Sequence, residues 1–420
     1  MAKRILTLCL ALVIGIAFAM PATAAVKSIK VGGDLVIRGI YRDNLDFGFG
    51  YYDYDSEDNA AAWLMTTTRI WVGAELTDNV SAVIRLMNER DWDSTEGNQH
   101  RDDLNLDLAY IKMKDLLMPG LTATIGRQEI LLGKGFVVGN VNGVTGNFQS
   151  IFGGDFTARK SFDAWRLDYE VGAAPLTITL FDAKIRENVP NNRDYDLWGI
   201  NAGYNTENAA IEGYVLLLDR QTGSFTNLMT YGARVDHTVL SVPGLNYNLE
   251  AAMQSGDFQG SDQDGWAGNA DVSYTFQNPM QFQLGAAWFY ASGDKGDSDG
   301  NWVPLYPDNL GDRIGRITYA SMLGTGFTPY LGTNISVPKI YAGLKPTEKV
   351  GLSLAWFPMS TIVDTYGDDD LGYGANFGAT YQYTEDVTLG ICLDYAAAGK
   401  AIPTDDEDAW QAIATVALSF

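Results

Sequence analysis

The sequence predicts an all-β protein: a transmembrane, antiparallel, up-and-down β-barrel of about 18 strands, with short periplasmic turns and long extracellular loops. Three observations predict this fold. Short segments alternate apolar with polar residues, short connections alternate with long ones, and the two ends of the chain carry export and assembly patterns. With 45 glycines and 12% aromatic residues among 420, the composition is typical of strands separated by turns.

The strands are predicted from a period of two, because successive side chains of a strand point to opposite faces. In one segment Leu245, Tyr247 and Leu249 alternate with Asn246 and Asn248, so one face is apolar and the other is polar. Eighteen segments follow this pattern, or sixteen strands if one hairpin is counted too many. They are 28–43, 63–77, 80–90, 104–116, 121–131, 162–173, 176–187, 194–205, 209–220, 228–241, 244–256, 265–277, 280–293, 334–345, 349–360, 371–383, 386–398 and 409–420.

The connections between these segments alternate in length. Every second one is a tight turn of Asn, Asp, Pro or Gly type, of hairpin length. These turns are 77–79, 118–120, 174–175, 206–208, 242–244, 278–279, 346–348 and 384–385. The other connections are longer, and the longest are 132–161 and 294–333. Strict alternation is the connection pattern expected of a transmembrane barrel with both termini in the periplasm. A sheet in hydrocarbon must also close, so that the backbone groups at its two edges are paired.

The amino-terminal end predicts export. Lys3 and Arg4 precede an apolar run at 5–20, and Ala22 and Ala24 form an A-x-A cleavage pattern, so residues 1–24 are expected to be a signal peptide. A membrane helix is the alternative, but the run is short for a span. The mature barrel is then 25–420.

The carboxy-terminal end predicts an outer-membrane destination. The last segment alternates from Trp410 to Phe420 and ends on an aromatic residue. It resembles the terminal signal by which bacterial outer-membrane barrels are recognised. Trp410 and Phe420 are therefore the expected assembly signal, with the barrel-assembly machinery, outer-membrane lipid and lipopolysaccharide as expected partners.

Charged residues on the polar faces predict a hydrated lumen. A charged group at membrane depth is costly unless it faces water or a partner, and a barrel this wide cannot be filled by its own side chains. The predicted wall cations are Arg38, Arg69, Arg85, Arg166, Arg234 and Lys339. Acids such as Asp34, Asp107, Asp168, Glu212 and Asp394 share the same face.

The connection 132–161 is the expected constriction. It is glycine-rich and carries Lys134, Arg159 and Lys160 with the single acid Asp155. Folded inward, it would select anions. Alternatively it is a flexible external loop with solvated charges. The connection 294–333 is the second candidate for a plug or lid.

The formal net charge of −23 comes largely from the other long connections. Their acids are expected to be solvated or to bind divalent cations between loops or at lipopolysaccharide. No basic stripe with interleaved aromatics indicates nucleic acid. Cys392 is the one cysteine of the mature chain, so neither a disulfide nor a haem-attachment motif is predicted, and no metal site or cofactor is expected.

The stretch TIGRQEILLGKGFVVGN at 124–140 resembles the strand-then-loop signature of the alginate-export family of outer-membrane barrels. The matching residues are Gly126, Arg127, Gln128, Gly133 and Gly135, with Arg38 and Asn44 in the opening strand. The resemblance implies an arginine-lined, anion-selective pore that passes an acidic polysaccharide, with Arg127 as a pore-lining cation. One departure is that the wall also holds many acids, which interrupts a basic track.

Several functions remain open at this point. The first is a passive channel for hydrophilic, anionic solutes, either general or dedicated to acidic oligo- or polysaccharide. The second is a barrel sheath around a partner such as an electron-transfer cytochrome. An outer-membrane enzyme is the weakest, because the chain holds only His100 and His237 and no serine stands in a motif with either. The solute, the pore radius and the oligomeric state do not follow from the sequence.

Overall fold

The computed structural model describes residues 26–45, 47, 60–92, 104–139, 161–186, 194–220, 225–294, 300–308, 310–320, 332–364, 367–402 and 408–420. The predicted signal peptide at 1–24 and the predicted site residues Arg159 and Lys160 lie outside these ranges. His100 also lies outside them.

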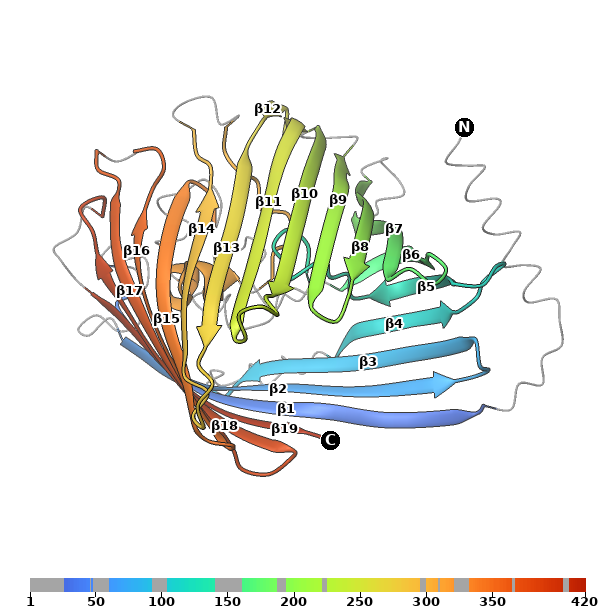
Figure 1. The fold of residues 1–420 in the computed structure, drawn as a ribbon, viewed down its shortest axis with the longest axis horizontal. Coiled ribbons are helices and arrows are strands. Elements are labelled where there is room, and N and C mark those ends of the chain that lie inside the picture. The colour runs from blue at the N-terminus through green and yellow to red at the C-terminus, as the bar shows by residue number, and fades with distance from the viewer. Residues whose placement is uncertain are drawn as a thin grey trace.

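The described chain is almost entirely strand, with two short helices in one connection (Figure 1). The elements are β1 (Ser28–Asp43), β2 (Ala60–Glu75), β3 (Val80–Asp91), β4 (Asn105–Met113), β5 (Leu121–Gln128), β6 (Phe162–Glu170), β7 (Leu176–Arg186), β8 (Tyr195–Asn205), β9 (Ala209–Arg220), β10 (Thr226–Thr238), β11 (Leu245–Phe258), β12 (Ser261–Gln263), β13 (Trp266–Thr275), β14 (Gln283–Ala291), α2 (Leu310–Ile314), α3 (Arg316–Ala320), β15 (Ile335–Thr347), β16 (Val350–Ser360), β17 (Asp370–Gln382), β18 (Val387–Ala398) and β19 (Ala409–Ser419).

The strands form one closed antiparallel sheet in which each pairs with its neighbour in sequence and β1 pairs with β19. At this seam Gly33 and Phe420 exchange two backbone hydrogen bonds of 3.0 Å. Strands β12 and β13 both pair with β11 in one continuous register, with Gln263 opposite Gly256 and Trp266 opposite Met253. They are one interrupted strand, so the barrel has 18 strands, as the sequence predicts.

The strand boundaries agree with the expected segments to within a few residues. Shifts of up to three residues occur at several strand ends, among them those of β5 and β14. Strand β5 ends at Gln128 because the chain then turns out of the wall, and β14 begins only at Gln283. Before β14, Gln281 has a φ of +47° and Phe276 donates its backbone N–H to Phe282 at 2.7 Å, which extends the turn.

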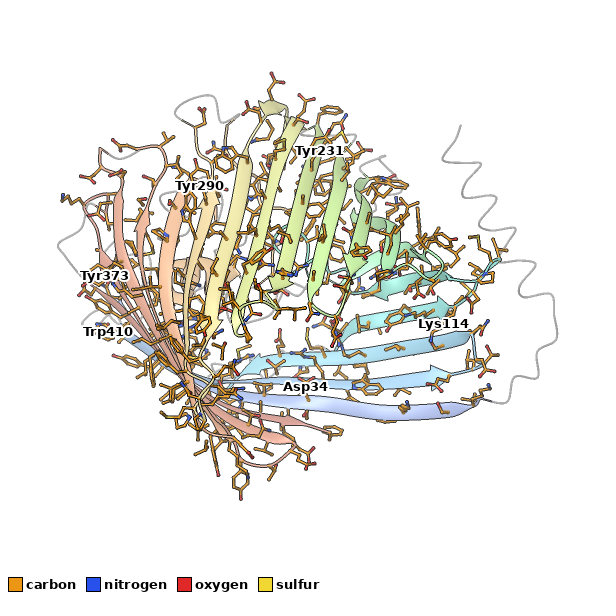
Figure 2. The ribbon with its side chains drawn as sticks, in the orientation of Figure 1. Asp34, Lys114, Tyr231, Tyr290, Tyr373 and Trp410 are labelled. Carbon is orange, nitrogen blue, oxygen red and sulfur yellow. The ribbon has the colours of Figure 1, made fainter. Side chains whose placement is uncertain are left out.

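The outer face of the sheet is apolar. Large exposed side chains such as Ile84, Leu249 and Trp288 alternate along their strands with inward polar residues. Aromatic pairs are found on this face, including Trp165 with Trp198, whose ring centroids are 5.8 Å apart. Figure 2 shows Tyr231 and Tyr290 in the upper halves of β10 and β14. These features suit a wall facing lipid, with aromatic residues toward its interfaces.

The lumen contains protein as well as space. Residues 129–139, 300–308 and 310–320 lie inside, and α2 and α3 lie behind β14 and β15 in Figure 1. They join a buried cluster with inward side chains of the wall, such as Phe181, Leu197 and Leu216, each 0% exposed. Among the described residues, no helix is long and apolar enough to cross a membrane.

Candidate pore constriction

The chain after β5 crosses the lumen. The backbone N–H of Gly133 donates to Glu212 Oε2 at 2.9 Å, and Lys134 Nζ lies 2.6 Å from Asp236 Oδ2. These acids stand on β9 and β10, whereas β5 is separated from β9 by three strands. The chain therefore spans the barrel between distant parts of the wall. Inward folding of the predicted constriction holds for its described part, 132–139.

A second inward segment, which includes Tyr306 and Asp308, is hydrogen-bonded to 135–139 of the first; this contact is called the clasp. Tyr306 donates its N–H to Val137 at 3.0 Å and accepts from Gly139 at 2.9 Å, and Asp308 donates to Gly135 at 2.7 Å. The two chains run parallel at this bridge. A Cβ at Gly135 would lie 2.6 Å from the Cβ of Asp308, and one at Gly139 would lie 2.5 Å from it. Only glycine lets the segments approach this closely.

Arg313 on α2 strengthens the clasp. Its Nη2 donates to the carbonyl of Lys134 at 2.9 Å, its Nη1 donates to that of Asp308, and its guanidinium lies 5.7 Å from the centre of the Phe136 ring. Phe136 in turn stacks with Trp302 at 6.2 Å. The two segments thus form one unit held by backbone, charge and aromatic contacts.

Helix α3 ties this unit to the opposite wall. Arg316 donates to both carboxylate oxygens of Asp394, at distances from 2.6 to 3.1 Å. Asp394 also accepts from Asn376 at 2.6 Å and from Gln411 at 3.0 Å. Burial works against the charge of Arg316, but the hydrogen bond and attraction to Asp394 prevail and raise the pKa of Arg316. Lys339 on β15 donates to the carbonyl of Asp312 on α2.

The six predicted wall cations lie on the inner face, and five of them have an acidic or carbonyl partner. The pairs are Arg69 with Asp34 at 3.3 Å, Arg85 with Asp107 at 2.5 Å and Glu129 at 2.6 Å, Arg166 with Asp168 at 2.9 Å, Arg234 with Glu212 at 2.5 Å and Asp236 at 2.7 Å, and Lys339 with the Asp312 carbonyl. The wall is therefore a set of ion pairs rather than an unbroken basic track.

Arg38 is the exception among the described wall cations. Its one hydrogen-bond partner in the described chain is the hydroxyl of Thr67, at 3.4 Å from Nη1. Thr415 stands directly opposite it across the β1–β19 seam. The guanidinium has five N–H donors, so most of them remain available to a solute.

Thr415, the residue opposite Arg38, lines a hollow of about 590 Å³ in the inner wall of β14 to β19. Small side chains line most of it: Gly343, Ser353, Gly378, Thr380, Gly390 and Thr415. Arg316 also lines the hollow and supplies a positive charge. Because these residues lack bulk, the inner wall is hollowed here, whereas other residues of the same strands, such as Val337 and Phe357, belong to the buried cluster.

The position of Arg127 differs from the prediction that it lines the pore. It stands opposite Ala109 on β4 and Asp163 on β6, and Ala109 stands opposite the exposed, outward Ile84. This register places Arg127 on the outer side of the wall, near the extracellular end of β5. It does not lie on the lumen face as the family resemblance implies. The strand alternates strictly here, so a single position separates the two faces.

The terminal residues and the histidine fall on the outer side. Trp410 is 52% exposed and packs on Tyr395 with ring centroids 4.5 Å apart, while Phe420 is 66% exposed. Their assembly role remains a prediction. His237 packs on Tyr247 at 5.4 Å on the outer face, away from the lumen. No group of His, Cys, Asp or Glu that could hold a metal is found within the described ranges.

The contact between the two inward segments was missed from the sequence. The spacing of Gly133, Gly135 and Gly139 is the signal that could have found it, since repeated glycines in a connection indicate close backbone approach. Gly133 and Gly135 have φ values of +55° and +70°. The partner, Asp308, lies over 150 residues away in sequence and carried no such signal.

Comparisons with known proteins agree with this architecture. The family described as "Alginate export" matches residues 27–387. No curated protein matches the sequence. Among solved structures, Pseudomonas aeruginosa OccK8 (OprE) aligns with a TM-score of 0.61 at 11% identity, covering 94% of this chain and 99% of that one.

Two further structures align similarly. A BenF-like porin from Pseudomonas fluorescens Pf-5 has a TM-score of 0.61 at 10% identity, covering 94% of this chain and all of that one. Acinetobacter baumannii OccAB2 has a TM-score of 0.59 at 10% identity, covering 93% and 98%. At these identities the likeness concerns the fold. With the family match, it indicates a channel of the bacterial outer membrane, and the chain belongs to the alginate export family.

Proposed function

We propose that this channel passes hydrophilic solutes passively with a preference for anions, and that acidic oligo- or polysaccharide is the solute class it fits. The observation that supports the proposal is Arg38, which stands on the inner face of β1 and hydrogen-bonds to the Thr67 hydroxyl at 3.4 Å rather than to a carboxylate of the described chain. A solute carboxylate could accept from its remaining donors.

The acids of the wall oppose this preference only weakly, because their oxygens are already used. Asp394 is 1% exposed and accepts from Arg316, Asn376 and Gln411. Asp236 is shared between Lys134 and Arg234. A carboxylate surrounded by donors attracts a passing cation less than an open one does, whereas Arg38 has no direct carboxylate partner in the described chain and shares the Thr67 hydroxyl with Glu89.

The shape of the lumen supports an extended solute. The clasped segments cross the lumen, and a hollow follows the inner face of six adjacent strands. The small hydroxyl side chains there, such as Ser353 and Thr380, can donate to or accept from sugar hydroxyls. This arrangement would suit a chain of sugar rings passing lengthwise.

The alternative functions have less support. A sheath around a folded cytochrome needs an empty lumen, whereas 129–139, 300–308 and 310–320 occupy part of it. We also propose that the protein is not an enzyme, because His237 lies on the outer face and acids of the described lumen such as Glu212 and Asp394 are paired with cations.

Liposome swelling tests the solute class. Proteoliposomes should admit acidic uronate disaccharides faster than neutral disaccharides of the same size. Replacing Arg38 with Ala should reduce this ratio about two- to fivefold, the effect of one poorly screened charge at close range. R38K should retain most of it. Equal rates for acidic and neutral sugars in the wild type would contradict the proposed preference.

A further inference from the structure

The Gly126-Arg127-Gln128 motif stands where the wall ends and the constriction begins. Each of its three residues makes a contact that ties β5 to a neighbouring strand, and none of them opens onto the hollow. The motif therefore needs an explanation other than pore lining.

Gly126 allows the backbones of β4 and β5 to approach closely. Its φ is +119°, and a Cβ there would lie 2.2 Å from the carbonyl oxygen of Ala109. Any other residue would push the two strands apart at this point. The distortion lies two residues before the strand ends.

Arg127 joins three strands on the outer side. Its Nε and Nη2 donate to the two carboxylate oxygens of Asp163 on β6, at 3.0 and 2.7 Å. Its Nη1 donates to the backbone carbonyl of Leu106 on β4 at 2.9 Å. This use of one planar guanidinium for a bidentate pair and a carbonyl depends on Arg geometry, which Lys cannot reproduce.

Gln128 closes the inner side of the same point. It is 3% exposed, and its Nε2 lies 3.1, 3.3 and 3.0 Å from the carbonyl oxygens of Thr124, Gly126 and Ala164. A buried amide held by backbone oxygens on β5 and β6 fixes the last residue of the strand.

The chain leaves the wall directly after this point. Glu129 pairs with Arg85 at 2.6 Å, Ile130 is 1% exposed, and Gly133 already contacts Glu212 across the lumen. The direction of the crossing is therefore set within a few residues of the motif.

We propose that Gly126, Arg127 and Gln128 form a clamp that fixes the exit of the constriction from the wall, so that Arg127 positions the constriction from outside the pore. Its positive charge does not contribute to ion selection. The clamp acts through its hydrogen bonds, and loosening it lets 129–139 fluctuate in the lumen.

Single-channel recording of the full chain in planar bilayers separates these roles. With R127A we expect the fraction of open time in altered conductance levels to rise about fivefold. This is the change expected if the held constriction loses about 1 kcal/mol of free energy relative to the loosened one. The reversal potential in a salt gradient should stay unchanged. R127K should spend as much time in altered conductance levels as R127A, because Lys keeps the positive charge but cannot form the bidentate pair with Asp163.

Two further variants sharpen the result. The exchange of Arg127→Asp with Asp163→Arg should restore part of the quiet current. Lys30→Ala is the control: Lys30 forms an exposed pair with Glu75 at 3.9 Å and does not touch the clamp. It should leave the current quiet. If R127A fails to insert, Gln128→Met should show the same fluctuations, since it removes the donors and retains the shape.

The outcomes are distinct. A reversal potential that moves toward cation preference in R127A and returns in R127K would overturn the inference and assign Arg127 to the pore. Quiet current in R127A and Q128M would also overturn it. Absence of conductance in the wild type would instead contradict the proposed channel function.

Discussion

At the residue scale, pairing decides what a charge can do. Arg38 and Arg127 both stand on strands of the barrel, but register places the first in the lumen and the second on the outer side. Arg316 lies in the lumen and is held by Asp394. The same residue type thus provides a structural tie, an anchor and, in the proposed function, a solute contact, depending on its neighbours.

Replacing Asp394 with Asn should release α3 from the wall. The carboxylate is buried, and removing its charge leaves Arg316 only neutral acceptors, a change that typically costs about 3 kcal/mol. The temperature at which the barrel unfolds on a heated gel should fall, and conductance should become larger and less steady. Lys30→Ala is the control, because Lys30 and Glu75 form an exposed pair at 3.9 Å. An unchanged unfolding temperature in D394N would contradict the anchoring role.

Gly135→Ala should open the clasp between the inward segments. Its added Cβ would collide with Asp308, in addition to a backbone cost of about 1 kcal/mol at positive φ. Gly172→Ala is a matched control, since Gly172 has a φ of +55° and nothing lies within 4 Å of an added Cβ. G135A should raise single-channel conductance and G172A should not. Equal conductance in both would show that the clasp does not limit flow.

At the element scale, the strands were predictable and the lumen contacts were not. The alternation from Leu245 to Asn248 shows which face of a single strand is apolar, so it can be recognised without knowing which strand pairs with it. The contact of Gly135 with Asp308 depends on two connections meeting across the barrel. Arg127 was misplaced because the family resemblance assigns a motif a role without its register.

Shortening the first inward segment should widen the pore. Replacing 133–138 with a two-residue Gly-Ser link removes the contacts to Glu212, Asp236 and Tyr306. We expect conductance to rise several-fold, because flow depends on the width of the narrowest part. A matched shortening of the turn at 241–243, outside the lumen segments, should have little effect. Unchanged conductance in the first variant would place the constriction elsewhere.

At the scale of the whole molecule, closure and occupancy together define the channel. The seam between β1 and β19 removes the sheet edges, which a barrel in hydrocarbon requires. Two inward connections then cross the lumen, and a hollow lined by Arg316 and by small residues remains in the inner wall of β14 to β19. The barrel thus provides the width, its inward connections narrow it, and Arg38 on its wall is the proposed anion contact.

The reversal potential of the wild-type channel in a potassium chloride gradient is the most direct test of the proposed anion preference and of the part that Arg38 has in it. We expect a wild-type potential displaced toward the equilibrium value for chloride. The displacement should be smaller in R38A and close to the wild-type value in R38K. A wild-type potential displaced toward the equilibrium value for potassium would contradict it.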